Sequence, residues 1–264
     1  MDLQLKNKTA FITGSTSGIG YAVAKRLLEE GMIVYINGRN QDSINIAIDS
    51  LKDEVSGAQV HGIALDFIKT EQLDEQLATL TDVDVLINNV GIYSSQSFFE
   101  TSEKIWLKQF QVNTMSGVIL SKHYLKGMLA RNWGRVLFIS SECTYLVPTD
   151  MISYSSTKAA IHALSRGLSQ LTKGTGVTSN VIVPGSTLSE GAKRFLTDKA
   201  AVEKTTIEEV ETNFFKNERT NSLLQRFAKT DEVATTIAYL CSPLASATNG
   251  SVIKVDGGST GGIL

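Results

Sequence analysis

Cysteine, proline and long apolar runs are all scarce in this chain of 264 residues. Its two cysteines, Cys143 and Cys241, are too few for a disulfide framework, and they favour a reducing compartment. Three prolines, with no segment rich in proline, glycine and serine, leave no candidate linker and favour one domain over residues 1–264. No stretch approaches the roughly 18 apolar residues of a membrane span, and residues 1–8 lack the apolar core of a signal peptide. We therefore expect a cytoplasmic protein.

An excess of one charge sign is also missing. Lysine and arginine together number 25, aspartate and glutamate 27, and the net charge is −2 with no block of like charges. This balance provides no electrostatic footprint for nucleic acid or for an anionic membrane, and we expect neither as a partner. The three histidines, His61, His123 and His162, do not have the spacing of metal ligands, so we expect no metal site.

What the chain does contain is an alternation of apolar and helix-length segments. Short apolar runs predict strands at residues 9–13, 32–36, 60–65, 83–87, 135–139, 177–183 and 251–255. Helical spacing follows the first two at residues 19–30 and 41–51. Strands that are apolar throughout belong to a parallel sheet covered on both faces. The prediction is an α/β fold: a Rossmann-type, doubly wound, mostly seven-stranded parallel sheet with helices on both faces.

Residues 186–230 depart from this alternation. They are polar and patchily helical, and they separate the last two strands by a long excursion. Excursions of this length are usually lids or disordered insertions, and we interpret this one as a substrate lid. Phe195, Phe214 and Phe215 within it suggest an apolar roof over a site.

A glycine-rich turn connects the first strand to the first helix. Residues 13–20 read Thr-Gly-Ser-Thr-Ser-Gly-Ile-Gly. Glycines at such a turn permit a close approach of the backbone to a pyrophosphate, which then lies on the N–H groups at the helix start. The turn therefore favours a dinucleotide site, and a purely structural turn is the alternative.

The end of the second strand bears on which dinucleotide binds. An NAD site places an acidic side chain there to hold the ribose 2′-hydroxyl. This chain has Asn37-Gly38-Arg39-Asn40 and no carboxylate before Asp42. A guanidinium pairs well with a 2′-phosphate, so Arg39 favours NADP, and a solvent-exposed arginine is the alternative.

Tyr154 and Lys158 form a YxxxK pattern. In a helix, positions i and i+4 lie on one face, so the phenol and the ammonium share the same space. A free tyrosine has a pKa of about 10. A nearby cation favours the phenolate, so we expect Lys158 to lower the pKa of Tyr154 and to make it fit for acid–base work. A surface pair on a helix is the alternative.

These motifs together resemble the short-chain dehydrogenase/reductase family in order and spacing. The set comprises the glycine loop, Asn-Asn-Val-Gly at 88–91, Asn113, Ser141 placed 13 residues before Tyr154, the YxxxK pair and Pro184-Gly185. The resemblance covers nearly the whole chain, through Asp-Gly-Gly at 256–258. Within the family the chain is similar to 3-oxoacyl-[acyl-carrier-protein] reductases.

The resemblance implies a role for each matching residue. Tyr154 is expected to protonate a carbonyl oxygen or to deprotonate an alcohol, while Ser141 hydrogen-bonds the substrate oxygen. Lys158 is expected to hold the nicotinamide ribose, and Asn113 to anchor a proton relay through water. Besides Tyr154 and Lys158, the residues expected to contact the cofactor are Gly14, Ser15, Ser17, Gly18, Ile19, Gly20, Arg39, Asp66, Asn89, Gly91, Pro184, Gly185, Thr187 and Ser189.

Three positions depart from the family pattern. Val90 stands where alanine is usual, and Ser189 stands where a threonine commonly lies near the nicotinamide carboxamide. Ser17 stands where many NADP-dependent members have a basic residue, so NAD remains an open alternative. Next to the catalytic serine, we expect Cys143 at the mouth of the site, and Glu142 to be structural or at its rim.

The resemblance also implies an activity and an assembly. We expect an oxidoreductase that transfers a hydride between NADP(H) and a ketone or secondary alcohol, in the carbonyl-reducing direction, with a small-molecule substrate. An NAD-dependent alcohol or sugar dehydrogenase of the same fold is one alternative. A non-catalytic nucleotide-binding regulatory protein is another. By resemblance the chain is expected to form a homotetramer or a homodimer.

Overall fold

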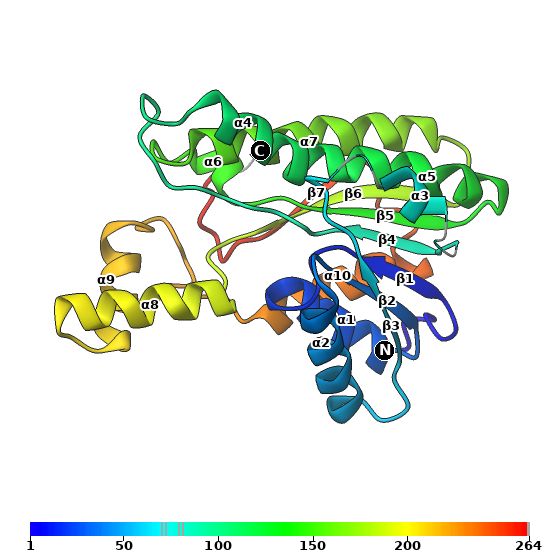
Figure 1. Ribbon diagram of the computed structural model, residues 1–264, viewed down its shortest axis with the longest axis horizontal. Coiled ribbons are helices and arrows are strands. Elements are labelled where there is room, and N and C mark those ends of the chain that lie inside the picture. Colours follow the sequence, from blue (N-terminus) through cyan, green and yellow to red (C-terminus); the bar gives the residue numbers. More distant parts are fainter. Residues whose placement is uncertain (70, 72, 79, 81, 263–264) are drawn as a thin grey trace.

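The computed structural model of the chain describes residues 1–69, 71, 73–78, 80 and 82–262. Its strands form one parallel sheet in the order β3-β2-β1-β4-β5-β6-β7 (Figure 1). The strands are β1 Thr9–Ile12, β2 Ile33–Gly38, β3 Gln59–Ala64, β4 Val85–Asn88, β5 Gly134–Ile139, β6 Val177–Pro184 and β7 Val252–Val255. Each one falls on a segment whose apolar run predicts a strand, and the predicted fold class is confirmed.

Helices cover both faces of this sheet, as the layers in Figure 1 show. On one face α1 packs on α10 beside α2, and on the other lie α3, α4, α5 and α7. Their bounds are α1 Gly18–Glu29, α2 Gln41–Glu54, α3 Leu73–Ala78, α4 Glu103–Phe110, α5 Ser116–Ala130, α7 Ile152–Leu171 and α10 Thr230–Cys241. Among the described residues, no helix combines the length and the apolar content needed to cross a membrane.

The central strand β1 is largely apolar because both faces of the sheet are covered there. In β1, Ala10 and Ile12 point into the core beneath α1 and α10, whereas Phe11 points into the core beneath α5 and α7. All three residues have no exposed surface. Successive side chains of a strand alternate between faces, so a strand buried on both sides needs an apolar residue at every position.

The sheet reverses its strand order beside β1. Chain connections run outward from β1 to β2 and β3 in one direction, and β4 then returns to the other side of β1. Ala10 pairs with Val34 of β2 and with Val85 of β4, so β1 lies at the point of reversal. In open parallel sheets, the carboxyl ends of the strands at this switch point form the ligand-binding crevice.

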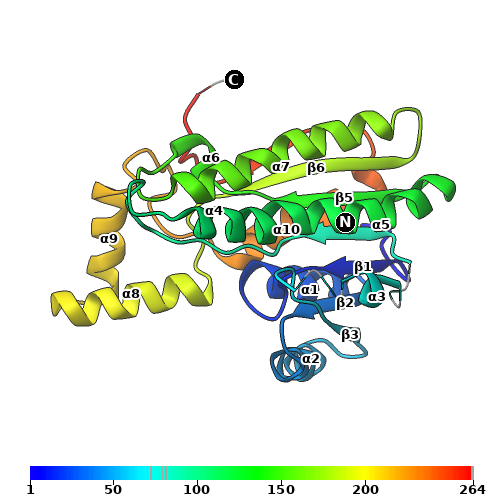
Figure 2. The same ribbon diagram turned by 45° about the horizontal axis from the view of Figure 1, so that its top comes forward.

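The excursion between β6 and β7 is helical. It contains α8 (Glu190–Glu203) and α9 (Ile207–Asn217), which pack on each other. In Figures 1 and 2 the two helices stand together beyond one end of the sheet. They have an apolar cluster of their own, separate from the two cores of the sheet and centred on Leu196, Phe214, Phe215 and Phe227.

Candidate active site

Two adjoining cavities run along the carboxyl ends of the strands. The first, of about 700 Å³, lies beyond β1, β2, β3 and β4. The second, of about 470 Å³, lies beyond β5 and β6 and is bordered by α7 and α8. Ser17, Gly91 and Tyr93 line both cavities, so the two cavities adjoin.

The glycine loop needs its glycines for two different reasons. Gly14 and Gly18 have φ angles of +59° and +61°, a conformation that side-chain-bearing residues rarely adopt. Gly20 has no such angle, but a Cβ there would lie 2.5 Å from the Gly14 oxygen and 2.6 Å from the Asn89 amide nitrogen. The Asn89 amide in turn donates to the backbone oxygens of Thr13 and Gly14, each at 2.9 Å. Asn89 therefore braces the loop, and contact with a cofactor stays a prediction for it.

Asn37 holds the loop from the other side, a role that the sequence does not reveal. Its Oδ1 accepts a hydrogen bond from the Gly14 nitrogen at 3.0 Å. Its amide donates to the backbone oxygens of Ile63 and Leu65, at 3.0 and 3.3 Å. The side chain is 2% exposed and thus joins the glycine loop to β3 from within the sheet.

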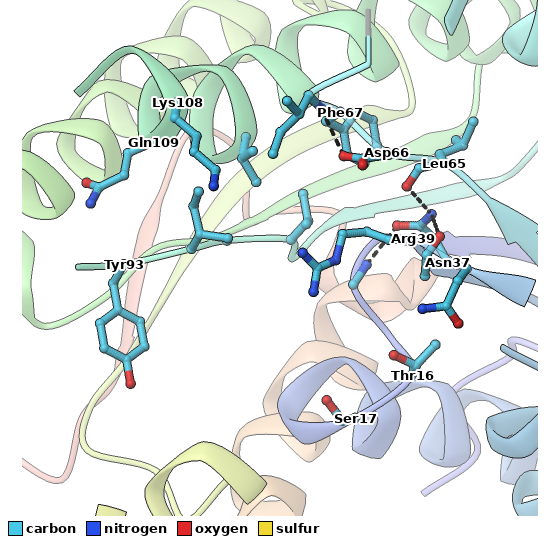
Figure 3. A pocket seen from close by; sticks show the side chains of 18 of the residues that line it. Thr16, Ser17, Asn37, Arg39, Leu65, Asp66, Phe67, Tyr93, Lys108 and Gln109 are labelled. Atoms are coloured by element: carbon cyan, nitrogen blue, oxygen red, sulfur yellow. Dashed lines mark hydrogen bonds between the residues drawn. The ribbon is translucent and has the colours of Figure 1, made fainter. Parts of the chain in front are cut away.

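Arg39 extends into the first cavity. It follows β2, and Figure 3 shows its guanidinium pointing into the open space, with Thr16 and Ser17 nearby. None of the ion pairs within the described residues includes Arg39. Asp66 lines the same cavity, and its Oδ1 accepts a hydrogen bond from the backbone of Ile68 at 3.1 Å. The first cavity thus offers an available cation at the position predicted to meet a 2′-phosphate.

The start of α1 already holds an anion from the chain itself. Oε2 of Glu190, in the first turn of α8, accepts a hydrogen bond from the Gly18 nitrogen at 2.7 Å. Helix N-termini bind carboxylates and phosphates through the same N–H groups. The Glu190 carboxylate therefore lies on an N–H group that is predicted to bind a phosphate of the cofactor.

Tyr154 and Lys158 lie on one face of α7, as their spacing predicts. Nζ of Lys158 donates a hydrogen bond to the backbone oxygen of Ile139, the last residue of β5, at 2.8 Å. The same nitrogen lies 5.9 Å from the centroid of the Tyr154 ring. Ser141 lies just beyond β5 and lines the same cavity as Tyr154 and Lys158, and its side chain lowers the pKa of the Tyr154 phenol. The second cavity thus brings together three of the four side chains predicted to be catalytic.

Burial opposes ionisation of both helix residues. It raises the pKa of the Tyr154 phenol, while the Ser141 side chain lowers that pKa by less. Burial also lowers the pKa of Lys158 to about 8. The expected lowering of the Tyr154 pKa by Lys158 is therefore wrong for the chain by itself, because desolvation outweighs an ammonium that points to the Ile139 oxygen. Tyr154 keeps its proton at neutral pH.

Asn113 lies in a π-helical turn, Gln111–Met115, between α4 and α5. Its amide donates to the Ile92 oxygen and to Oγ1 of Thr157, both at 2.9 Å, and its Oδ1 accepts from the Ile92 nitrogen at 2.7 Å. Single π-helical turns are frequent at functional sites. The side chain ties the segment that follows β4 to α7, and the proton relay at Asn113 stays a prediction.

The segment after β6 closes the second cavity. Gly185 lies against Asp256, whose backbone oxygen would be 2.6 Å from a Cβ on the glycine. Oγ1 of Thr187 donates to the Gly185 oxygen at 2.9 Å, and the Ser189 hydroxyl caps α8 by accepting from the Ala192 nitrogen at 3.4 Å. Pro184, Thr187 and Ser189 line the cavity, and their cofactor contacts stay predictions.

The second cavity also contains an ion pair that the sequence does not indicate. Oε1 of Glu142 accepts hydrogen bonds from Nε of Arg219 at 3.0 Å and from Oγ of Ser186 at 2.7 Å. Glu142 is expected to be structural or at the rim. Its side chain is 4% exposed and paired with Arg219, which excludes the rim and fits the structural alternative. Its φ of −54° and ψ of −25° begin the short helix α6 (Cys143–Leu146), so strand alternation does not govern its direction. Cys143 lines the cavity as expected, and burial raises the pKa of its thiol.

A family model of short chain dehydrogenases matches residues 8–200. The chain belongs to the short-chain dehydrogenase family, whose members are NAD(P)-dependent oxidoreductases.

Similar proteins cover the chain from end to end. The uncharacterized oxidoreductase YvaG of Bacillus subtilis is 42% identical over 258 residues, 98% of each chain. A 3-oxoacyl-[acyl-carrier-protein] reductase, FabG of Aquifex aeolicus, is 30% identical over 263 residues, covering 98% of this chain and 99% of FabG. The crystal structure of an L-sorbose reductase from Gluconobacter frateurii, complexed with NADPH and L-sorbose, has a TM-score of 0.92 at 27% identity over 100% of both chains.

Proposed function

We propose that this protein is an NADP-dependent carbonyl reductase that converts a ketone to a secondary alcohol. The observation that carries the proposal is the continuity of the cleft. Arg39 lies in the cavity at one end, and Ser141, Tyr154 and Lys158 line the cavity at the other. A dinucleotide that spans both cavities has one end beside the arginine and the other beside the tyrosine.

Three residues of the second cavity each have a separate role in the proposed reaction. When bound, a reduced nicotinamide supplies the hydride for the carbonyl carbon. Tyr154 donates its phenolic proton to the carbonyl oxygen, and the Ser141 hydroxyl stabilises the charge that develops on that oxygen. Lys158 holds the nicotinamide ribose and lies beside the phenol. Burial raises the pKa of Tyr154, so the phenol carries at neutral pH the proton that the proposed reduction requires.

Support for NADP comes from Arg39 and from similar proteins. The guanidinium points into the first cavity without an ion-pair partner among the described residues. The L-sorbose reductase was solved with NADPH, as was an actinorhodin polyketide ketoreductase that has a TM-score of 0.86 and 26% identity. An NAD-dependent alcohol or sugar dehydrogenase is the alternative, and it requires tighter binding of NADH than of NADPH.

The proposal is tested with Tyr154→Phe, which removes only the phenolic oxygen. We expect NADPH binding to be unchanged and ketone reduction to fall by about a hundredfold or more. Tyr145→Phe is the matched control, because Tyr145 lies on α6 with 44% exposure and outside the lining of the second cavity. Normal turnover by Tyr154→Phe contradicts the proposal. A wild type that binds NADPH and reduces nothing in a broad carbonyl panel favours the non-catalytic, nucleotide-binding alternative.

We further propose a homotetramer or homodimer assembled through α4. Leu107 and Phe110 on this helix are 71% and 43% exposed, and Phe99 just before it is 95% exposed. Apolar side chains gathered at one exposed helix mark an association surface. Light scattering on the wild type and on Leu107→Asp tests this assembly, since the substitution is expected to give monomers.

A further inference from the structure

One carboxylate oxygen in the second cavity is left without a hydrogen-bond partner. Glu142 Oε1 is satisfied by Arg219 and Ser186, but Oε2 is buried and has no partner within the described chain. A buried, unmatched acceptor costs free energy, and for a charged group the cost is larger than for a neutral one. Glu142 is among the residues that line the second cavity, and a ligand donor that reaches this oxygen would satisfy it.

Glu142 lies close to the atoms predicted to react. It is the residue after Ser141, and its backbone nitrogen donates to the Pro184 oxygen at 2.9 Å, which fixes this turn against the end of β6. Ser141, Glu142 and Tyr154 all line the second cavity. The Glu142 charge also acts on the phenol, since it contributes to the raised pKa of Tyr154. A ligand group that meets Glu142 is therefore close to a carbonyl held by Ser141 and Tyr154.

The carboxylate is held in place by the helical excursion. Arg219 follows α9, and its guanidinium lies 5.3 Å from the centroid of the Phe214 ring, which stacks on Phe227 at 5.1 Å. Its side chain is 17% exposed, so the ion pair with Glu142 is shielded from solvent. Phe214, Phe227 and Phe195 provide an apolar border to the same cavity. The cavity thus combines the carboxylate of Glu142 with an apolar border formed by three phenylalanines.

We propose that Glu142, oriented by Arg219 and Ser186, selects a carbonyl substrate that carries a hydroxyl group on the carbon next to the carbonyl. The hydroxyl donates to Oε2, and the apolar remainder of the substrate packs on the phenylalanine border. A ketone without this hydroxyl leaves Oε2 without a hydrogen-bond donor, and it is therefore reduced with a lower kcat/KM. This inference rests on the proposed reduction of ketones, which it narrows to hydroxyketones.

Two ketones of nearly equal shape test the inference. 2-Hydroxyacetophenone and propiophenone differ only in a hydroxyl that replaces a methyl group, and both have an aromatic ring for the apolar border. The kcat/KM of each is measured with saturating NADPH in the wild type and in Glu142→Gln, which keeps the size of the side chain and removes its charge. The comparison between the two proteins cancels the intrinsic difference in reactivity of the ketones.

We expect the wild-type preference for the hydroxyketone to fall by about tenfold or more in Glu142→Gln, since hydrogen bonds to charged groups are worth that much. Glu218→Gln is the matched control: it makes the same change in the residue before Arg219, where the exposed carboxylate pairs with Lys199 at 3.1 Å. The control should leave the preference unchanged. Ser186→Ala, which removes one donor to Oε1, should lower the preference by about threefold.

The outcomes separate this inference from the proposed function. An equal loss of kcat/KM for both ketones in Glu142→Gln shows a purely structural role and overturns the inference. A preference that persists in Glu142→Gln also overturns it while leaving ketone reduction intact. If Glu142→Gln does not fold, an unchanged preference in Ser186→Ala overturns it. A wild type that oxidises NADPH with neither ketone, nor with any other carbonyl, contradicts the proposed function instead.

Discussion

Glu190 Oε2 lies 2.7 Å from the backbone nitrogen of Gly18, so the first turn of α8 is hydrogen-bonded to the loop that begins α1. The two residues are 172 positions apart in the chain. If the cofactor phosphate binds the Gly18 nitrogen as predicted, it competes there with the Glu190 carboxylate, and two negative charges at one helix N-terminus also repel.

Glu190→Gln is therefore expected to bind NADPH about threefold to tenfold more tightly than the wild type. The gain should shrink as salt is raised, because ions screen the repulsion. Fluorescence titration of NADPH measures it, with the exposed Glu203→Gln at the other end of α8 as control. Unchanged or weaker binding by Glu190→Gln contradicts the competition.

Arg39→Ala is expected to weaken NADPH binding by about ten- to a hundredfold and to leave NADH binding within about twofold. The reason is that only NADPH carries the 2′-phosphate that the guanidinium can pair with. The control is Arg26→Ala on the exposed side of α1, where the arginine pairs with Glu29 at 3.4 Å. If NADH binds the wild type more tightly than NADPH does, the NADP assignment fails.

Two glycines in helices should respond oppositely to the same substitution. Gly20→Ala in α1 places a Cβ within 2.8 Å of the Gly14 oxygen, the Asn89 amide and the Ser15 Cα, so we expect loss of cofactor binding and a lower unfolding temperature. Gly167→Ala in α7 meets nothing within 4 Å and should stabilise the fold by about 1 kcal/mol. Thermal unfolding checks both. If Gly20→Ala keeps its cofactor binding and unfolding temperature, the loop can move away from Asn89 to make room for the Cβ, and the prediction is wrong.

Lys158→Met should have a larger free energy of unfolding than the wild type at pH 7. This difference between the two proteins should become smaller at higher pH. Burial lowers the folded-state pKa of Lys158 to about 8 from the ordinary 10.5. Below pH 8 both states carry the proton, and the buried ammonium destabilises the fold by up to about 3 kcal/mol. Between pH 8 and 10.5 only the unfolded state stays protonated, so the wild type gains stability as the pH rises.

Urea unfolding of both proteins at pH 7 and at pH 9.5 measures this difference. Lys158→Met also loses the hydrogen bond to the Ile139 oxygen, which offsets part of its gain in stability at both pH values. This loss does not alter how the difference in stability changes with pH. Lys122→Met, on the exposed side of α5, is the matched control. An advantage that does not narrow between the two pH values refutes the prediction.

The fold follows from local patterns that are readable along the chain. The strands are predictable because the central ones, such as β1 and β4, are buried on both faces and consist largely of apolar residues. The glycine loop is predictable because Gly14 and Gly18 adopt φ angles that residues with side chains rarely adopt. Tyr154 and Lys158 are predictable because helical geometry places positions i and i+4 on one face.

The site depends on contacts between distant segments, and these escape sequence reasoning. Glu142 is hydrogen-bonded to Ser186 and Arg219, which lie 44 and 77 positions away in the chain. Asn37 is hydrogen-bonded to Gly14, which lies 23 positions away. The ionisation of Tyr154 was predicted in the wrong direction, because the YxxxK spacing reveals the neighbouring cation and not the burial. Desolvation depends on how many segments cover a group, which no local pattern records.

The amino-acid sequence by itself determined the doubly wound sheet, the glycine loop and the pairing of Tyr154 with Lys158, since burial on two faces and helical periodicity each act over a few residues. Only the tertiary structure decided that Glu190 lies on the Gly18 nitrogen and that Glu142 presents a buried, unmatched oxygen. Those features arise where α8, α9 and the ends of β5 and β6 meet, and hydrogen-bond geometry between them exists only once the chain has folded.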